Sequence, residues 1–109
     1  MKRTHDFMTK MVTVAETPSF KNLVDDYFDP QSFEVFKEHI ARNPTDGDLI
    51  KDSQGVRKVR WSRPGSGKSR SYRVLTCYEE VTDTVWLLTI YAKSETSTIK
   101  GPAAKKLKP

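Results

Sequence analysis

The chain of 109 residues is long enough for one domain with a modest core, but too short for that core and a separate cofactor-binding domain. Its single cysteine excludes an internal disulfide, and no apolar run approaches the roughly twenty residues of a membrane-spanning helix. With a formal net charge of +5 and no signal-type start, we expect a soluble cytoplasmic protein.

The chain begins with a predicted strand and a predicted helix. Met11–Val14 has the β-type composition of a short strand, expected at a sheet edge or as the first partner of a hairpin. Thr17 followed by Pro18 is typical of an N-cap and a first helical turn. Together with the apolar spacing that follows, this start predicts a helix to about Tyr27.

A second helix is predicted directly after the first. Asp29-Pro30 repeats the start signal, and the apolar spacing continues to about Ala41. Asn43-Pro44 ends the helix because a residue before proline avoids helical dihedrals. The side chains expected to be buried are Phe33, Phe36 and either Val35 or Ile40.

The remaining chain changes from helical to strand-like periodicity. The predicted strands are Leu49–Ile50, Val56–Trp61, Tyr72–Tyr78 and Thr84–Tyr91. Ser62–Ser71 is a Gly/Ser-rich loop, and Gly101–Pro109 is expected to be a frayed basic tail. Two helices followed by a β meander predict a single α+β domain over residues 1–109, with an antiparallel sheet.

Positive charge is concentrated in the second half of the chain. Residues 1–50 carry six Lys/Arg against nine Asp/Glu, whereas residues 51–109 carry thirteen against five. The acid-free stretch contains Arg57, Lys58, Arg60, Arg63, Lys68, Arg70 and Arg73. Surfaces normally intersperse both signs, so this density on predicted strands indicates a polyanionic partner; the alternative is a basic face that only aids solubility.

The Gly67-Lys68-Ser69 sequence superficially suggests a nucleotide-binding loop. That motif requires a glycine five positions before Gly67, and Ser62 stands there instead. The stretch also leads into a predicted strand rather than a helix, so the sequence argues against ATP or GTP binding.

Alternation along the basic strand predicts a shared face. If Val59 and Trp61 point to the core, Lys58 and Arg60 point together to solvent, and Arg73 reaches the same face from the next strand. Arginine forks and a lysine point charge suit both passive phosphate binding and stabilisation of the transition state of RNA cleavage by a 2′-OH. Composition does not decide between the two.

Other catalytic chemistries have little support in the sequence. His5 and His39 are far apart, and no acids near the basic strands have a metal-ligand spacing, so we predict neither a metal nor another cofactor. Cys77 lies in an apolar run and is expected to be buried, which argues against a thiol nucleophile.

Six short motifs recur in the order of one known family. They are Thr13–Phe20 (TVAETPSF), Asn43–Ile50 (NPTDGDLI), Gly55–Trp61 (GVRKVRW), Gly65–Ser69 (GSGKS), Tyr72–Val74 (YRV) and Leu87–Glu95 (LLTIYAKSE). Over about residues 12–96, the chain resembles the RelE/HigB toxin superfamily of bacterial type II toxin–antitoxin systems, and its HigB-like branch in particular. Residues 1–10 and 100–109 lie outside the match and are expected to be flexible.

The resemblance implies a compact microbial-ribonuclease-like fold and cleavage of mRNA in the ribosome. The catalytic residues that it implies are Lys58, Arg60, Arg73, Tyr91 and Lys93. RNA contacts are expected from Arg57, Arg63, Lys68 and Arg70. The implied partner is a small antitoxin, HigA-like and of helix-turn-helix type. Two alternatives stay open: a ParE-like gyrase inhibitor, and a non-catalytic RNA-binding regulator.

Overall fold

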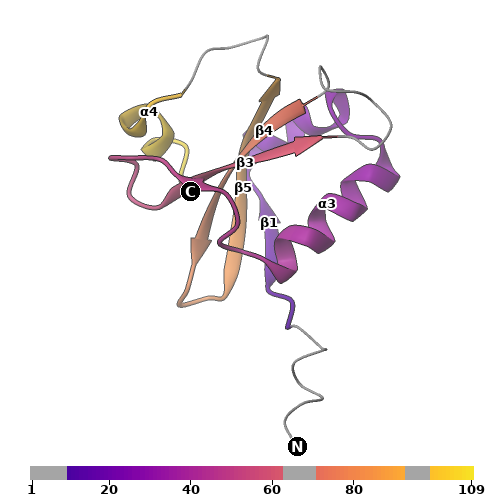
Figure 1. Ribbon diagram of the computed structural model, residues 1–109, viewed down its shortest axis with the longest axis horizontal. Coiled ribbons are helices and arrows are strands. Elements are labelled where there is room, and N and C mark those ends of the chain that lie inside the picture. The colour runs from indigo at the N-terminus through magenta and orange to yellow at the C-terminus, as the bar shows by residue number, and fades with distance from the viewer. Residues whose placement is uncertain (1–9, 63–70, 93–98) are drawn as a thin grey trace, which may run out of the picture.

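The computed structural model describes residues 10–62, 71–92 and 99–109 (Figure 1). The elements are β1 (Thr13–Glu16), α2 (Pro18–Leu23), η1 (Val24–Asp26), α3 (Pro30–Arg42), β2 (Asp48–Leu49), β3 (Val56–Ser62), β4 (Ser71–Glu79), β5 (Thr84–Ala92) and α4 (Gly101–Lys105). Their order confirms the predicted α+β class. No helix among these residues is long and apolar enough to cross a membrane.

The five strands form one sheet in the order β1-β5-β4-β3-β2. Strands β2 to β5 are antiparallel neighbours, as the meander predicts. β1 lies at the sheet edge, but it runs parallel to β5, so the hairpin alternative for this strand is wrong. The sheet is therefore mostly, rather than wholly, antiparallel.

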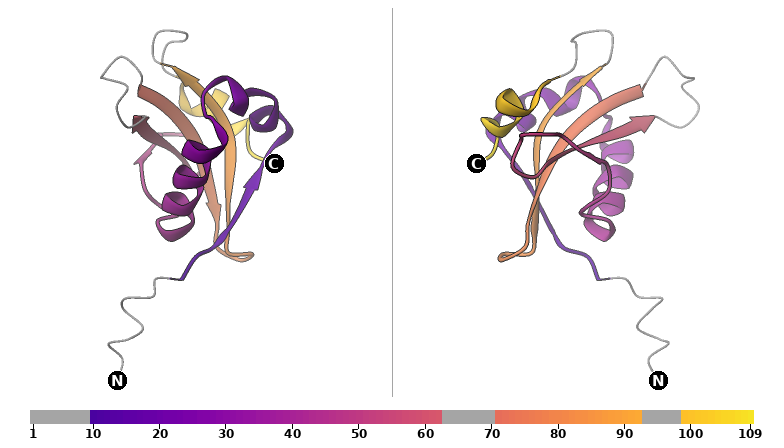
Figure 2. Two further views of the ribbon diagram at one scale, coloured as in Figure 1. Left: turned by 90° about the vertical axis from the view of Figure 1, so that its right-hand side faces the viewer. Right: turned by 60° about the vertical axis from the view of Figure 1, so that its left-hand side comes forward.

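Helices cover both faces of this sheet (Figure 2). Phe20, Phe36 and Ile40, from α2 and α3, pack against one face in a core that includes Val59, Val74 and Leu87. On the other face, Ala104 of α4 packs with a smaller cluster of buried residues from the strands. The members of that cluster are Val56, Leu75, Cys77, Leu88 and Tyr91.

Capping residues explain where the first two helices begin. The Thr17 side chain accepts a hydrogen bond from the Phe20 N–H, and its hydroxyl donates to the Leu88 carbonyl at 3.0 Å, tying the start of α2 to β5. Asp29 and Ser32 form a reciprocal capping box at the start of α3. The first predicted helix is shorter than expected, because the α-helix ends at Leu23 and a 3₁₀ turn continues to Asp26.

Of the two residues predicted as alternatives for the buried face of α3, Ile40 is buried and Val35 is not. Ile40 is fully buried, whereas Val35 is 57% exposed. Phe33, Phe36 and Ile40 recur at three- and four-residue spacing and so share one helical stripe, from which Val35 is displaced.

The expectation of a frayed C-terminal tail is wrong. Residues 101–105 form α4, Ala104 is completely buried, and the Lys108 ammonium donates to the Gln54 carbonyl at 2.7 Å. Two prolines and many lysines suggested a solvated segment, but Pro102 occupies the first helical turn, where its missing N–H costs nothing. The apolar side chains of Ala104 and Leu107 then complete the core on this face.

We expect Gly101→Ala to weaken the docking of α4. A Cβ at this position would overlap the carbonyl oxygen of Lys51 and the backbone of Asp52, which cannot move aside as a flexible side chain would. Overpacking of this kind typically costs about 1–3 kcal/mol, so urea unfolding should show a lower free energy of unfolding. Lys105→Ala, on the exposed side of α4, is the control and should change stability by less than about 0.5 kcal/mol. Equal stability of the two variants would contradict a docked α4.

Candidate functional site

Three of the predicted site residues form a row across the three central strands, near one end of the sheet. Arg60 on β3 lies opposite Arg73 on β4, and Arg73 lies opposite Tyr91 on β5. Directly opposed side chains have Cβ atoms about 4.5–5.5 Å apart, so the three groups are neighbours on one face. The register therefore brings together residues that lie 13 to 31 positions apart in the chain.

Lys58 lies on the same face, one pair further along β3. Its neighbours in register are Leu75 on β4 and Asp48 on β2. Val59 and Trp61 belong to the opposite core, as the alternation predicts. The shared face is not entirely open to solvent, because the cluster under α4 occupies its adjoining part.

A bulge in β5 is what places Tyr91 in this row. Leu75 pairs with Thr89 and Thr76 pairs with Leu87, so Leu88 is the extra residue between them. Leu88 and Tyr91 consequently face the α4 side together although their spacing is odd. Strict alternation from Leu88 would have turned Tyr91 toward α2 and α3.

The opposition of Arg60 and Arg73 is electrostatically costly by itself. Like charges directly across a strand pair destabilise a sheet. The positive charge of Arg60 is partly neutralised by Asp48, whose carboxylate accepts a hydrogen bond from the guanidinium at 3.1 Å. Arg73 donates to the Ser71 hydroxyl at 3.1 Å, and among the described residues no carboxylate forms an ion pair with Arg73 or Lys58. This arrangement suits an anionic ligand that bridges the two arginines.

Tyr91 adds a neutral donor to the positive row. Its side chain is only 8% exposed, and burial raises the pKa of the phenol. The positive charges of Arg73 and Arg60 and a hydrogen bond with the Ile99 backbone act in the opposite direction and lower that pKa without reversing the shift. The hydroxyl therefore keeps its proton at neutral pH and acts as a hydrogen-bond donor.

The other predicted site residues are not all brought to this face. Arg57 points to the opposite side of β3, where its guanidinium donates to the Gly47 carbonyl at 3.1 Å and holds the connection between α3 and β2. Arg63, Lys68, Arg70 and Lys93 lie outside the described residues. The segments that carry them join β3 to β4 and follow β5, so both are attached at the end of the sheet where the arginine row lies.

Asp48 is a site residue that the sequence reasoning missed. It belongs to the Asn43–Ile50 motif, where the sequence predicts no role for it in the basic site. The two-residue strand β2 pairs Asp48 with Lys58 and places its carboxylate on Arg60. The local sequence carries no signal for this contact, because its two residues are twelve positions apart.

The described residues give no support to a mechanism that uses a metal ion or a cysteine thiol. Among the described residues, no group of three His, Cys, Asp or Glu side chains is placed to hold a metal ion. His39 is paired with Asp46 at 2.7 Å, and its ring lies tilted against that of Trp61 with the centroids 5.1 Å apart. Cys77 is buried as predicted, and burial raises the pKa of its thiol, which disfavours the thiolate.

No protein-family model matches the chain. Solved structures of other proteins share its architecture, including the following two. One is the toxin–antitoxin complex RelBE2 of Mycobacterium tuberculosis, with a TM-score of 0.58, 17% identity, and coverage of 79% of this chain and 95% of the other. The second is a mutant of the Escherichia coli toxin RelE in the free state, with a TM-score of 0.57, 11% identity, and coverage of 88% and 97%. The fold is that of the RelE toxins. At these identities, the likeness establishes the RelE-like fold alone.

The first prediction for this site concerns the contact between Arg73 and Tyr91. Arg73→Gln should raise the pKa of Tyr91 further, because it removes a positive charge that favours the phenolate. Carbon-13 NMR of ring-labelled tyrosine, followed through alkaline pH, would measure this pKa separately for each of the four tyrosines. Because burial holds the folded-state pKa above that of the unfolded chain, the associated stability is complete below about pH 10 and is lost at higher pH.

Arg57→Gln is the matched control for this titration. It also removes one positive charge, but from the opposite face of β3, so the pKa of Tyr91 should not change. An equal rise in both variants would mean that Arg73 has no direct contact with Tyr91.

The second prediction concerns Asp48. Asp48→Asn should tighten binding of a 2′-O-methylated RNA oligonucleotide by roughly two- to fivefold at low salt, because the phosphate no longer competes with a carboxylate for Arg60. Fluorescence anisotropy at two salt concentrations would measure the change. Asp46→Asn removes the same charge from the same connection but contacts His39 instead, and it should leave the affinity unchanged. Weaker binding by Asp48→Asn would show that Asp48 orients Arg60 rather than competing for it.

Proposed function

We propose that this protein is the toxin of a type II toxin–antitoxin system, and that it inhibits translation by cleaving mRNA on the ribosome as a metal-independent endoribonuclease. The observation that carries the proposal is the row of Arg60, Arg73 and Tyr91 on a RelE-like sheet. The HigB-like motif series supports assignment to that branch of the superfamily.

The proposed reaction needs no cofactor. The 2′-oxygen beside the scissile bond attacks the phosphorus, the bond to the 5′-oxygen breaks, and the products are a 2′,3′-cyclic phosphate and a 5′-hydroxyl. The 2′-OH loses a proton and the leaving 5′-oxygen gains one. The main demand on the protein is to hold the backbone in line and to stabilise the extra negative charge on the phosphate as it becomes pentacoordinate.

The described residues meet that demand in distinct ways. Arg60 and Arg73 bind the non-bridging oxygens from adjacent strands, and their charges are already in place before the reaction. Tyr91, which is neutral, donates a hydrogen bond to the same phosphate. Lys58 acts as a point charge one step along β3, on the neighbouring phosphate.

The remaining assignments extend the site toward the ribosome and a partner. Lys93 completes the catalytic set, and Arg63, Lys68 and Arg70 contact RNA from the loop between β3 and β4. Arg57 serves the fold through its bond to Gly47 and contributes long-range charge to RNA binding. The partner is an antitoxin of the HigA-like, helix-turn-helix type; the RelBE2 structure is itself a toxin–antitoxin complex.

Removing the positive charges of the row should abolish activity. We expect a variant with Lys58, Arg60 and Arg73 all replaced by alanine to lose growth arrest on induced expression in bacteria, and to lose new transcript ends mapped by primer extension. Removal of one such electrostatic contact commonly costs about 10²–10³-fold in rate, so three leave no detectable cleavage. Circular dichroism and thermal unfolding would show that the variant is folded.

A charge-matched control distinguishes the loss of these particular side chains from the loss of net positive charge. Replacing Lys10, which precedes β1, together with Lys21 on α2 and Arg42 on α3 by alanine removes three positive charges outside the row and should leave cleavage intact. Cuts that vanish when translation is blocked would establish ribosome dependence. Growth arrest with DNA damage and intact mRNA would instead indicate gyrase inhibition, and RNA binding with a steep salt dependence but no cuts would indicate a non-catalytic regulator.

A further inference from the structure

Residues 99–109, which include α4 and are called the α4 segment below, carry positive charge without any acid. The four basic residues of this segment are Lys100, Lys105, Lys106 and Lys108. The first three are exposed. Among the described residues, none of the four lysines forms an ion pair. None of them has a role in the site proposed above.

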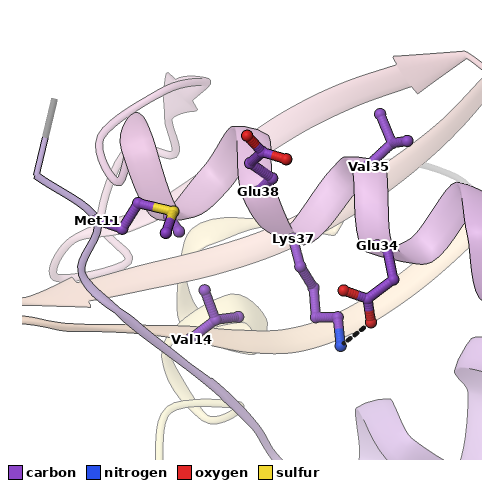
Figure 3. A pocket seen from close by; sticks show the side chains of 7 residues that line it. Met11, Val14, Glu34, Val35, Lys37 and Glu38 are labelled. Carbon is purple, nitrogen blue, oxygen red and sulfur yellow. Dashed lines mark ion pairs between the residues drawn. The ribbon is translucent and has the colours of Figure 1, made fainter. Parts of the chain in front are cut away.

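The helical side of the sheet shows the more usual pattern, in which charges of both signs are mixed. From Lys10 to Arg42 the chain has four basic and six acidic residues. A groove of about 530 Å³ between α3 and β1 is lined in part by Glu34, Lys37 and Glu38, and Lys37 pairs with Glu34 at 2.8 Å (Figure 3). Arg42 pairs with Glu38 at 3.2 Å. Mixed charge of this kind keeps a surface soluble, and the α4 segment lacks it.

Two acidic residues lie beside the α4 segment but do not cancel its charge. The backbone of Asp52 lies against Gly101, and Asp52 is preceded by the exposed Lys51. Glu79 lines a small depression together with Lys108. With Lys51 included, five lysines are set against these two acids, which leaves a formal excess of +3.

The lysines are held in place by the docking of the segment. At its beginning, the Tyr91 hydroxyl is hydrogen-bonded to the Ile99 backbone. Ala104 is completely buried, and near the end of the segment the Lys108 ammonium donates to the Gln54 carbonyl at 2.7 Å. A ligand that binds here does not have to order a flexible tail, so less conformational entropy is lost on binding.

The segment also adjoins the basic side chains of β3. Val56, Lys58 and Arg60 alternate along one face of this strand, and Val56 is buried under α4. Lys58 therefore lies next to the part of the strand that α4 covers. Positive charge thus continues from β3 onto α4, on the side of the sheet away from α3 (Figure 2).

The residue types of the segment favour binding to a phosphate backbone rather than to bases. A lysine ammonium binds phosphate as a point charge and carries no sequence information. Single-stranded RNA is typically bound by stacking of its bases on aromatic side chains, and residues 99–109 contain no aromatic residue. Trp86 borders the same depression as Lys108, but its indole packs on the cluster under α4 and donates to Glu79 at 3.4 Å. Base-paired RNA, by contrast, is recognised mostly through its shape, phosphates and 2′-hydroxyls.

We propose that the α4 segment is a second RNA-binding surface, which holds the phosphate backbone of base-paired RNA beside the strand bound by the arginine row. Lys100, Lys105 and Lys106 contact the phosphates, while Lys108 stays bonded to Gln54. An acidic protein segment is disfavoured as the occupant, because protein interfaces are depleted of lysine and enriched in aromatic side chains. That the ribosome supplies the base-paired RNA rests on the proposed function, whereas duplex binding itself does not.

Fluorescence anisotropy with the full chain tests this surface. The probes are a 2′-O-methylated RNA duplex of about sixteen base pairs and one of its strands alone, neither of which can be cleaved by a 2′-OH. Replacing Lys100, Lys105 and Lys106 by alanine should weaken duplex binding at least about tenfold at low salt, and single-strand binding by less than about threefold. The salt dependence of duplex binding should become less steep by roughly two to three in the slope of log affinity against log salt, because three phosphate contacts are lost.

A charge-matched control and a measurement without substitutions accompany this test. Replacing Lys10, Lys21 and Arg42 by alanine also removes three positive charges and should change duplex affinity by less than about twofold. Thermal unfolding would show that both variants are folded. In the unsubstituted protein, nitrogen-15 NMR should show saturable shifts at the amides of residues 100–106 when the duplex is added.

The contrary results have distinct meanings. Equal losses for the duplex and the single strand would mean that α4 and the arginine row hold the same strand, and equal losses in both variants would show an effect of net charge alone. Tighter binding of an octaglutamate peptide than of the duplex would identify an acidic protein segment as the occupant. Each of these results would overturn the assignment of base-paired RNA to this surface.

Failure of this inference can be told apart from failure of the proposed function. Loss of duplex affinity in the α4 variant, together with no RNA cleavage in cells by the unsubstituted protein, would support the surface and refute the proposed function. Cleavage in cells with unchanged duplex affinity in the α4 variant would refute the surface alone.

Discussion

The register between β4 and β5 is the constraint on which the rest of the molecule depends. Both strands are buried on two faces, against α2 and α3 on one side and α4 on the other. A one-residue slip would exchange these faces for every side chain, and would place the guanidinium of Arg73 in the helical core. The extra residue Leu88 absorbs the mismatch within β5, so that Leu87 and Ile90 fill one core while Leu88 and Tyr91 face the other. The bulge is thus both a packing device and the reason that Tyr91 meets Arg73.

Because helices pack on both faces of the sheet, the molecule has a basic surface on one side and an acidic surface on the other. The row of Arg60, Arg73 and Tyr91 borders the apolar core under α4. The charges of the two arginines are therefore close to a region of low dielectric constant but still accessible to a ligand. The helical side is acidic and has the groove between α3 and β1.

Sequence reasoning succeeded where the signal was local. The caps at Thr17 and Asp29 and the alternation around Val59 depend on residues within four positions, and each appears in the structure as predicted. It failed where a contact between distant segments decided the outcome. The tail after Gly101 has the composition of a solvated segment, yet it docks because Gly101 alone lets the backbone approach Lys51 and Asp52. Asp48 was overlooked for the same reason, since its partner Arg60 lies on another strand.

By itself, the sequence determined the order and type of the elements from β1 to β5, the α+β class, the basic character of the central strands and the burial of Cys77. These follow from periodicity and composition, which act over a few residues. Only the tertiary structure decided the parallel pairing of β1, the position of Tyr91 beside Arg73 and the pairing of Arg60 with Asp48. All of these depend on strand order and register, and register is set by how the whole set of buried side chains fills two cores at once.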